Sequence, residues 1–167
     1  MLKIEVLTRE HHRKAFDCGV SALNAYLSQT AVQHAQKGLS KTFVAVEESQ
    51  PLEIVGFFTL TLTEIDRALL PEQFAKKLPN HPLPVIKLAR LAIAKAHQGR
   101  GMGEALLFES LSRAYRAYEL VGAVALFVDA KDERAALFYQ KYGFVPIPSF
   151  PLQLFLSFDT IGDIVGK

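Results

Sequence analysis

Three alternate glycines, Gly99, Gly101 and Gly103, lie between an apolar segment and a helical pattern, and this arrangement constrains the fold more than any other feature of the sequence. The preceding segment, residues 87–94 (KLARLAIA), predicts a strand. An apolar stripe predicts a helix after the glycines, at Leu107, Leu111, Ala114 and Tyr118. A strand that turns through glycines into a helix points backbone N–H groups and the positive helix end at one spot, which favours an anionic ligand. The alternative is a tight turn that needs glycine only for a positive φ.

The spacing around these glycines distinguishes between the known phosphate-binding patterns. A Walker loop requires Gly-Lys followed by Ser or Thr, and that ending is absent. The dinucleotide-binding fingerprint requires a glycine where Glu104 stands. ATP and NAD are therefore disfavoured as ligands of this turn.

Hydrophobic periodicity divides the chain into alternating strands and helices. Strand patterns cover residues 2–7, 40–47, 54–63, 87–94, 123–129 and 152–158. Helical patterns cover residues 20–35, 71–77, 107–118 and 134–142. We expect 40–47 and 54–63 to form an antiparallel hairpin, and the nearly apolar 123–129 to be a central strand buried on both faces. This order predicts one mixed α/β domain over residues 1–167.

Two local signals bound these elements. Asp132 is placed to cap the helix over 134–142, and Gly143 is placed to end it. Three prolines predict a surface loop without regular structure as far as Lys87, and they are Pro79, Pro82 and Pro84.

Composition and charge exclude several classes of protein. Half of the residues are apolar, enough for one globular core, and a formal charge of +2 leaves any nucleic-acid binding to a local patch. The single cysteine, Cys18, forms no internal disulfide, and the charges within residues 1–10 exclude a signal peptide. Because the longest uncharged run contains prolines, no membrane span is expected, and we predict a cytoplasmic protein. The histidines and Cys18 lack metal-ligand spacing, which predicts no metal site.

Three segments resemble the GNAT family of N-acetyltransferases. Gln98, Gly101 and Gly103 match its acetyl-CoA loop, Gln/Arg-x-x-Gly-x-Gly/Ala, and residues 91–93 match the strand before that loop. Residues 135–144 (AALFYQKYGF) are similar to its A-x-x-F-Y-x-x-x-G-F signature. The resemblance covers roughly residues 40 to 158. It implies acetyl-CoA as co-substrate and an α/β (α+β) fold, with a mixed central sheet that is flanked by helices and splayed at the acetyl-CoA site.

The resemblance also assigns roles in acetyl-CoA binding. Gln98 is assigned to cofactor binding through its match to the loop motif, and the pyrophosphate would bind the amides of Gly99, Arg100, Gly101, Met102 and Gly103. The pantetheine arm would pair with the strand residues Leu91, Ala92 and Ile93. A backbone amide near Ala92 or Ile93 would polarise the thioester carbonyl. Asp132 stands where relatives outside the toxin group often carry an asparagine whose side-chain amide contacts the cofactor.

Tyr139 falls at the position of the tyrosine that, in this family, protonates the departing CoA thiolate. A phenol with a pKa near ~10 keeps its proton at neutral pH and can donate it to a thiolate whose conjugate acid lies near ~8.5. The resemblance therefore implies a general acid. The alternative is an aromatic residue that packs beside Phe138 and Tyr142.

Within the family, residues 16–27 (FDCGVSALNAYL), the LARLAI strand and the VDAKDERAALFY stretch are most similar to acetyltransferase toxins of bacterial toxin–antitoxin pairs. This similarity implies acetylation of the α-amino group of aminoacyl-tRNA, a block of translation, and a cognate ribbon-helix-helix antitoxin as partner. Two alternatives stay open: a housekeeping GNAT enzyme that acetylates a small amine or a protein N-terminus, and a CoA-binding or RNA-binding module without catalysis. The sequence also leaves open whether the protein is a homodimer.

The absence of a base in the predicted strand before the loop limits which kind of acceptor amine we expect. The strand over 87–94 contains no carboxylate, and a lysine amine with a pKa near ~10.4 is almost wholly protonated at pH 7. An α-amino group, with a pKa near ~8, already has a neutral fraction. The missing base favours an α-amine, although Glu64 and Asp66 could act through water.

Between Glu72 and Glu104 the sequence contains basic residues but no acidic ones. Such a stretch is a candidate surface for RNA phosphates. The residues we assign to tRNA binding are Lys76, Lys77, Lys87 and Arg90. The alternative is a solvated face of scattered positive charges.

Overall fold

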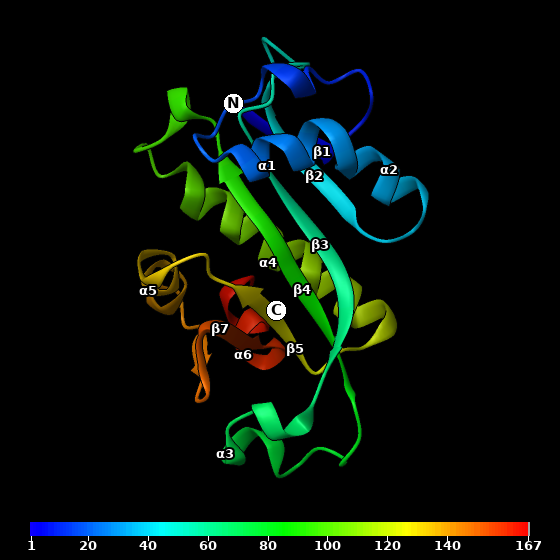
Figure 1. The fold of residues 1–167 in the computed structure, drawn as a ribbon, viewed down its shortest axis with the longest axis vertical. Helices are drawn as coiled ribbons and strands as arrows, with labels where there is room; N and C mark the ends of the chain where they lie inside the picture. The colour runs from blue at the N-terminus through cyan, green and yellow to red at the C-terminus, as the bar shows by residue number, and fades with distance from the viewer. Residues whose placement is uncertain (167) are drawn as a thin grey trace. The chain divides into compact units, whose positions relative to one another are not determined.

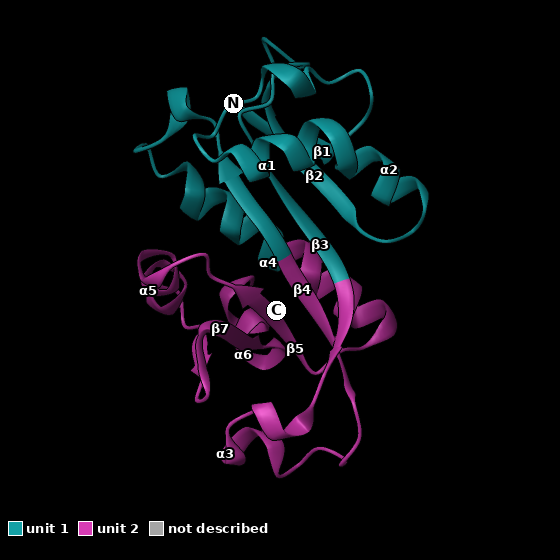
Figure 2. Ribbon diagram, in the orientation of Figure 1, with its two compact units in different colours: residues 1–61, 89–111 teal, residues 62–88, 112–167 magenta. Residues whose placement is uncertain are grey.

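The computed structural model describes residues 1–166 and divides into two compact units (Figure 2). Unit 1 consists of residues 1–61 and 89–111, and unit 2 consists of residues 62–88 and the chain from residue 112 onward. Two strands, β3 (Gly56–Ile65) and β4 (Leu83–Ile93), and the helix α4 (Met102–Val121) pass from one unit into the other. Both units therefore contain part of the same sheet.

The strands of unit 1 form an antiparallel group (Figure 1). β1 (Leu2–Val6) pairs with β2 (Lys41–Glu47), and β2 pairs with β3. The register sets Phe43 opposite Phe58, with ring centroids 5.1 Å apart in a stacked arrangement. Aromatic pairs directly across two strands stabilise their pairing. The predicted hairpin is confirmed.

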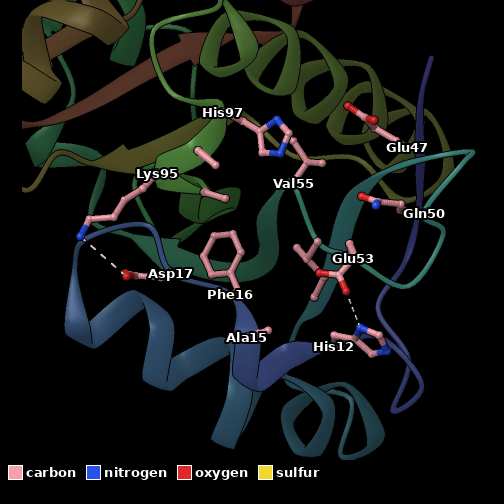
Figure 3. A pocket seen from close by; sticks show the side chains of 13 residues that line it. His12, Ala15, Phe16, Asp17, Glu47, Gln50, Glu53, Val55, Lys95 and His97 are labelled. Atoms are coloured by element: carbon pink, nitrogen blue, oxygen red, sulfur yellow. Dashed lines mark hydrogen bonds and ion pairs between the residues drawn. The ribbon is translucent and has the colours of Figure 1, made fainter.

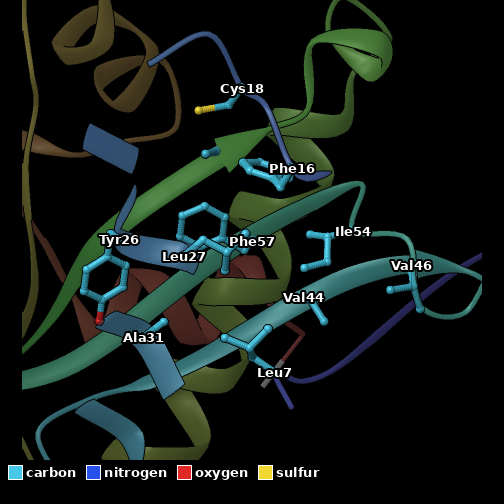
Figure 4. Packing of buried hydrophobic residues seen from close by; sticks show 11 residues of the cluster. Leu7, Phe16, Cys18, Tyr26, Leu27, Ala31, Val44, Val46, Ile54 and Phe57 are labelled. Carbon is cyan, nitrogen blue, oxygen red and sulfur yellow. The ribbon is translucent and has the colours of Figure 1, made fainter. Parts of the chain in front are cut away.

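A helical segment packs against these strands. It consists of α1 (Ser21–Ala25), a π-helical turn η2 (Tyr26–Thr30) and α2 (Ala31–Gln36), and it follows the short 3-10 helix η1 (Arg13–Ala15). Leu27 and Ala31, which recur at helical spacing, are fully buried. The cluster that they join contains Leu7, Phe16, Cys18, Tyr26, Val44, Val46, Ile54, Phe57 and Ala92 (Figure 4). Cys18 is thus a small buried hydrophobic residue in this core.

The start of β3 has room only for glycine. Phe57 points into the cluster, so alternation along the strand turns Gly56 to the opposite face, toward α4. A Cβ atom at Gly56 would lie 2.9 Å from the carbonyl oxygen of Ala92 and 3.1 Å from Cδ2 of Leu106. The absence of a side chain therefore lets β4 and α4 approach β3 closely.

We predict that Gly56→Ala lowers the free energy of unfolding by about 1–3 kcal/mol, because the added methyl overpacks the contact with a backbone atom that cannot rotate away. Denaturant unfolding of the variant and the parent measures the difference. Equal unfolding midpoints would contradict this prediction, since they would mean that the neighbouring elements move aside freely.

Unit 2 is built around β5 (Ala125–Asp129). β5 pairs parallel with β4 from Ile86 to Leu88 and antiparallel with β7 (Phe150–Ser157). The short β6 (Val145–Ile147) pairs antiparallel with β7. Residues 125–128 are buried, as expected for a central strand. The seven strands have the order β1-β2-β3-β4-β5-β7-β6, and the predicted mixed α/β fold is confirmed.

Besides the part of α4 from residue 112 onward, unit 2 contains α3 (Glu72–Ala75), α5 (Glu133–Lys141), α6 (Phe158–Ile164) and the 3-10 turn η3 (Arg67–Leu69). The Asp132 carboxylate accepts a hydrogen bond from the Ala135 amide at 2.8 Å, which confirms the predicted cap of α5. Gly143 follows α5 with a φ of +99°, as expected for a residue that ends a helix. Within residues 1–166, no helix is both long enough and apolar enough to cross a membrane.

The prediction that prolines prevent regular structure as far as Lys87 is wrong. β4 begins at Leu83 and includes Pro84, whose carbonyl accepts a hydrogen bond from the Val124 amide at 2.9 Å. Proline has no N–H to donate, but its fixed φ is compatible with an extended strand end. Pro84 is exposed and precedes the part of β4 that pairs with β5.

Two elements lie outside the sequence prediction. β6 has three residues and contains Pro146, so it is too short to show an alternating pattern. α6 begins directly after β7, where the Ser157 hydroxyl accepts a hydrogen bond from the Thr160 amide at 3.2 Å. Since Phe158 completes the strand pattern and also begins the helix, periodicity does not separate the two.

Candidate functional site

The glycine-rich loop joins β4 to α4 within unit 1 through the 3-10 turn η4 (Lys95–His97). Gly99 and Gly101 each have a φ of +77°, a backbone conformation that residues with side chains rarely adopt. Gly103 lies inside α4, and its φ is not positive. A positive φ thus explains the glycines at positions 99 and 101 but not the one at position 103.

The loop presents a run of free backbone amides. Among residues 1–166, no group accepts a hydrogen bond from the amides of Gly99, Arg100, Gly101, Met102 or Gly103. Further into the helix, the Ala105 amide donates to the Gly101 carbonyl at 3.2 Å. A Cβ atom at Gly99 or Gly101 would meet nothing within 4 Å, so the space beside the loop is open. Free amides at the start of a helix form a binding site for an anion.

The side chain of Gln98 hydrogen-bonds to two backbone carbonyls of unit 1. Its side-chain nitrogen donates to the carbonyl of Ile93 at 2.9 Å and to the carbonyl of Cys18 at 3.0 Å. These two bonds use both hydrogens of the amide, and the remaining Oε1 can only accept. Because phosphate oxygens are also acceptors, the side chain of Gln98 has no donor left for a pyrophosphate.

Tyr139 lies on α5 in unit 2, and the residue is 8% exposed. The ring packs edge-on against Phe138 and Phe144, with centroids 5.3 Å and 5.4 Å away. Burial raises the pKa of Tyr139 to about 12. No residue within 1–166 hydrogen-bonds the Tyr139 hydroxyl, and no side-chain oxygen there is both sealed from solvent and unbonded. The hydroxyl therefore reaches the surface while the ring is part of the core.

The basic residues assigned to tRNA have unequal surroundings. The Lys87 ammonium lies 2.6 Å from the Asp129 carboxylate on the neighbouring strand, so its charge is already paired. The Arg90 guanidinium lies 3.5 Å from the centre of the Tyr26 ring. Lys76 and Lys77, directly after α3, are exposed. The assignment of Lys87 to tRNA binding stays a prediction, and sequence periodicity does not reveal its partner, because it does not show which carboxylate lies across the sheet.

A pocket of about 300 Å³ lies in unit 1, on the N-terminal side of the glycine-rich loop (Figure 3). His12 and Glu53 interact across it at 2.7 Å, and Lys95 lies 3.7 Å from Asp17. Phe16 lies between these two pairs in the view (Figure 3). The segment around Asp17 thus contacts the turn that precedes the loop, a connection that the sequence prediction missed.

Comparison with known proteins identifies the family. Residues 38–146, more than half of the chain, match the family described as acetyltransferase (GNAT) domain. The chain belongs to the GNAT acetyltransferases. This GNAT enzyme is 32% identical to a tRNA-acetylating toxin of Mycobacterium tuberculosis, over 91% of this chain and 89% of the relative.

Solved structures agree with this assignment. AtaT complexed with acetyl-methionyl-tRNAfMet matches with a TM-score of 0.90 and 30% identity, over 98% of this chain and 99% of AtaT. A tyrosine-to-phenylalanine mutant of AtaT, bound to acetyl-CoA and to the C-terminus of the antitoxin AtaR, matches with a TM-score of 0.84 and 27% identity over 99% of both chains. The GNAT chain is thus homologous to tRNA-acetylating toxins over nearly its full length.

Proposed function

We propose that this chain is a toxin that transfers the acetyl group of acetyl-CoA to the α-amino group of aminoacyl-tRNA and so blocks translation. The observation that carries the proposal is the run of free amides from Gly99 to Gly103 at the start of α4, in a chain homologous to tRNA-acetylating toxins. An acetylated α-amine is no longer a nucleophile, so the charged tRNA cannot extend a peptide. We assign the whole chain to one catalytic domain that acts in the cytoplasm.

The loop fits the diphosphate of acetyl-CoA. We assign the amides of Gly99, Arg100, Gly101, Met102 and Gly103 to the phosphate oxygens, with the positive end of α4 adding to the attraction. Leu91, Ala92 and Ile93 at the end of β4 would hold the pantetheine arm by strand-like bonds. β4 pairs with β5 from Ile86 to Leu88, so the later residues of β4 lie outside that pairing. We also assign Asp132 to cofactor binding, and this assignment rests only on its position directly before α5.

The chain itself supplies two elements of the acyl transfer. Acetyl-CoA brings the activated acetyl group. An amide near Ala92 or Ile93 would donate to the carbonyl oxygen as negative charge develops there. When the neutral amine nitrogen bonds to the carbonyl carbon and the carbon–sulfur bond breaks, the nitrogen would release one proton to solvent, and Tyr139 would give its phenolic proton to the sulfur and regain one from solvent. Burial that raises the pKa of this phenol to about 12 would equally disfavour an unprotonated thiolate beside it.

The acceptor side is consistent with an α-amine. β4 carries no carboxylate, and of the two alternative bases, Asp66 already accepts a hydrogen bond from the Ala68 amide at 2.9 Å as the cap of η3. Glu64 is exposed and would act only through water. An amine with a pKa near ~8 needs no dedicated base at neutral pH, whereas a lysine does.

The test is acetyl transfer from labelled acetyl-CoA to charged tRNA by the purified full-length chain. We expect transfer to aminoacyl-tRNA, none to deacylated tRNA, and slow transfer to Nα-acetyl-lysine, whose only amine is that of the side chain. Transfer only to a small amine or to a peptide N-terminus would replace this function by a housekeeping one. Acetyl-CoA binding without transfer to any amine would overturn the enzymatic function.

We also propose a cognate antitoxin of the ribbon-helix-helix type as partner, since an AtaT structure includes the C-terminus of its antitoxin AtaR. Expression of the chain alone should stop growth, and co-expression of a small neighbouring gene product should restore it. Normal growth at high expression of the catalytically competent chain would contradict a toxin. Whether the chain also forms a homodimer is measured by its mass in solution.

The basic surface gives a further prediction. Lys76→Ala combined with Lys77→Ala should weaken binding of charged tRNA and flatten its dependence on salt, because each lost phosphate contact releases about one fewer counterion. Salt titrations of tRNA affinity measure the slope. The matched control is Lys14→Ala with Lys37→Ala, which removes the same charge from exposed positions of unit 1. Equal slopes for both double variants would exclude Lys76 and Lys77 from the RNA-binding surface.

A further inference from the structure

We propose that residues Asp17–Gly19 anchor the acetyl-CoA loop, and that Gln98 and Asn24 are positioning residues that act through this anchor rather than on the cofactor. The proposal rests on the proposed binding of acetyl-CoA by the loop. The anchor lies within the segment FDCGVSALNAYL, residues 16–27.

Hydrogen bonds of the Asp17 and Asn24 side chains, which we call the clasp, hold the backbone of the anchor in place. Oδ1 of Asp17 accepts hydrogen bonds from the Gly19 amide at 2.9 Å and from the Asn24 side-chain nitrogen at 3.0 Å. Oδ1 of Asn24 in turn accepts from the Cys18 amide at 2.9 Å. Gly19 has a φ of +89°, which lets the chain turn sharply inside this clasp. The bonds from Gly19 and Asn24 also lower the pKa of Asp17.

The clasp turns two backbone carbonyls toward the loop. The carbonyl of Asp17 accepts from the Lys95 amide at 2.9 Å, and the carbonyl of Cys18 accepts from Gln98 at 3.0 Å. Gln98 also donates to Ile93, the last residue of β4. One side chain therefore joins the end of β4, the anchor and the residue immediately before Gly99.

The loop needs this support because glycine loses the most conformational freedom when it is ordered. Gly99 and Gly101 could adopt many conformations if Gln98 were released, and the ligand would then have to order them on binding. The exposed ion pair between Lys95 and Asp17, at 3.7 Å, contributes little to this restraint. The restraint comes from the hydrogen bonds of Gln98 and Asn24.

The experiment is calorimetry with acetyl-CoA, without any acceptor, on the full-length chain. Gln98→Glu keeps the shape but removes both donors, and Asn24→Ala opens the clasp from a residue outside the loop. We expect each to raise the Kd for acetyl-CoA about tenfold, and the double variant to raise it little further, because both act through one anchor. Gln98→Arg, which retains N–H donors, should recover most of the affinity, and Lys95→Ala should match the parent.

Three outcomes decide the proposal. A parent that fails to bind acetyl-CoA overturns the proposed function itself. A parent that binds, with Asn24→Ala of unchanged affinity or with additive effects in the double variant, overturns the anchor and returns Gln98 to direct contact with the cofactor. Hydrogen exchange separates a general loss of folding from release of the loop, since the anchor predicts faster exchange of amides near residues 98–101 while the β2–β3 amides keep their protection.

Discussion

Gly101→Val is expected to lower the affinity for acetyl-CoA by more than about a hundredfold while the chain stays folded. Gly101 has a φ of +77°, which a β-branched residue strongly disfavours, so the loop must change its course. The amides from Gly99 to Gly103 then no longer converge, and each hydrogen bond to a charged group is worth about 1.5–3 kcal/mol. Calorimetry with acetyl-CoA measures the loss. An unchanged affinity would reduce the loop to a turn without a ligand.

Two further substitutions distinguish a loss of affinity caused by backbone strain from one caused by crowding of the ligand. Gly38 has a φ of +75°, and a Cβ atom there would meet nothing within 4 Å, so Gly38→Val introduces the same backbone strain away from the loop. Its affinity for acetyl-CoA should equal that of the parent. Gly103 has a helical backbone, so any loss of affinity in Gly103→Val reports crowding of the ligand by the side chain rather than strain.

Tyr139→Phe is expected to lower turnover by about 10²- to 10⁴-fold with little change in acetyl-CoA affinity, because general acid catalysis is worth that much and the ring remains. Folding should be unaffected, since no residue within 1–166 bonds the hydroxyl. Steady-state rates with charged tRNA measure the effect. Tyr118→Phe, which removes a phenol from α4, is the control and should turn over like the parent. Parental turnover of Tyr139→Phe would leave Tyr139 with only its packing role.

The pKa of about 12 for Tyr139 sets the expected pH dependence. Folding raises this pKa above the ~10 of a free tyrosine, so the stability that the neutral phenol contributes is complete below about pH 10 and is lost as the pH rises through about 12. The acid form therefore persists throughout the neutral range. Initial rates should rise between about pH 6.5 and 8.5 as the amine loses its proton, with no falling limb in that interval.

Patterns of neighbouring residues predicted most of the strands and helices of the fold. The alternation in β2 and β3 gave the hairpin, the apolar run of β5 gave a central strand, and Asp132 and Gly143 marked the ends of α5. These features depend on neighbours a few residues away, which the sequence shows directly. The prediction failed where two properties of one residue favour different structures. In β4, the fixed φ of Pro84 is compatible with a strand, although proline has no N–H group to donate.

The features of the candidate site also divide into those set by neighbouring residues and those set by residues distant in the chain. The sequence by itself determined the glycine-rich loop, the tyrosine of α5 and the family, because these are motifs of contiguous residues. Only the tertiary structure decided that Lys87 pairs with Asp129, that Arg90 lies over Tyr26, and that Gln98 bonds to Cys18, 80 residues earlier in the chain. It also decided the pKa of Tyr139, since burial is a property of the packed core. Hydrogen bonds, ion pairs and desolvation act through space over a few ångströms, and no pattern of neighbours along the chain encodes which distant residue occupies that space.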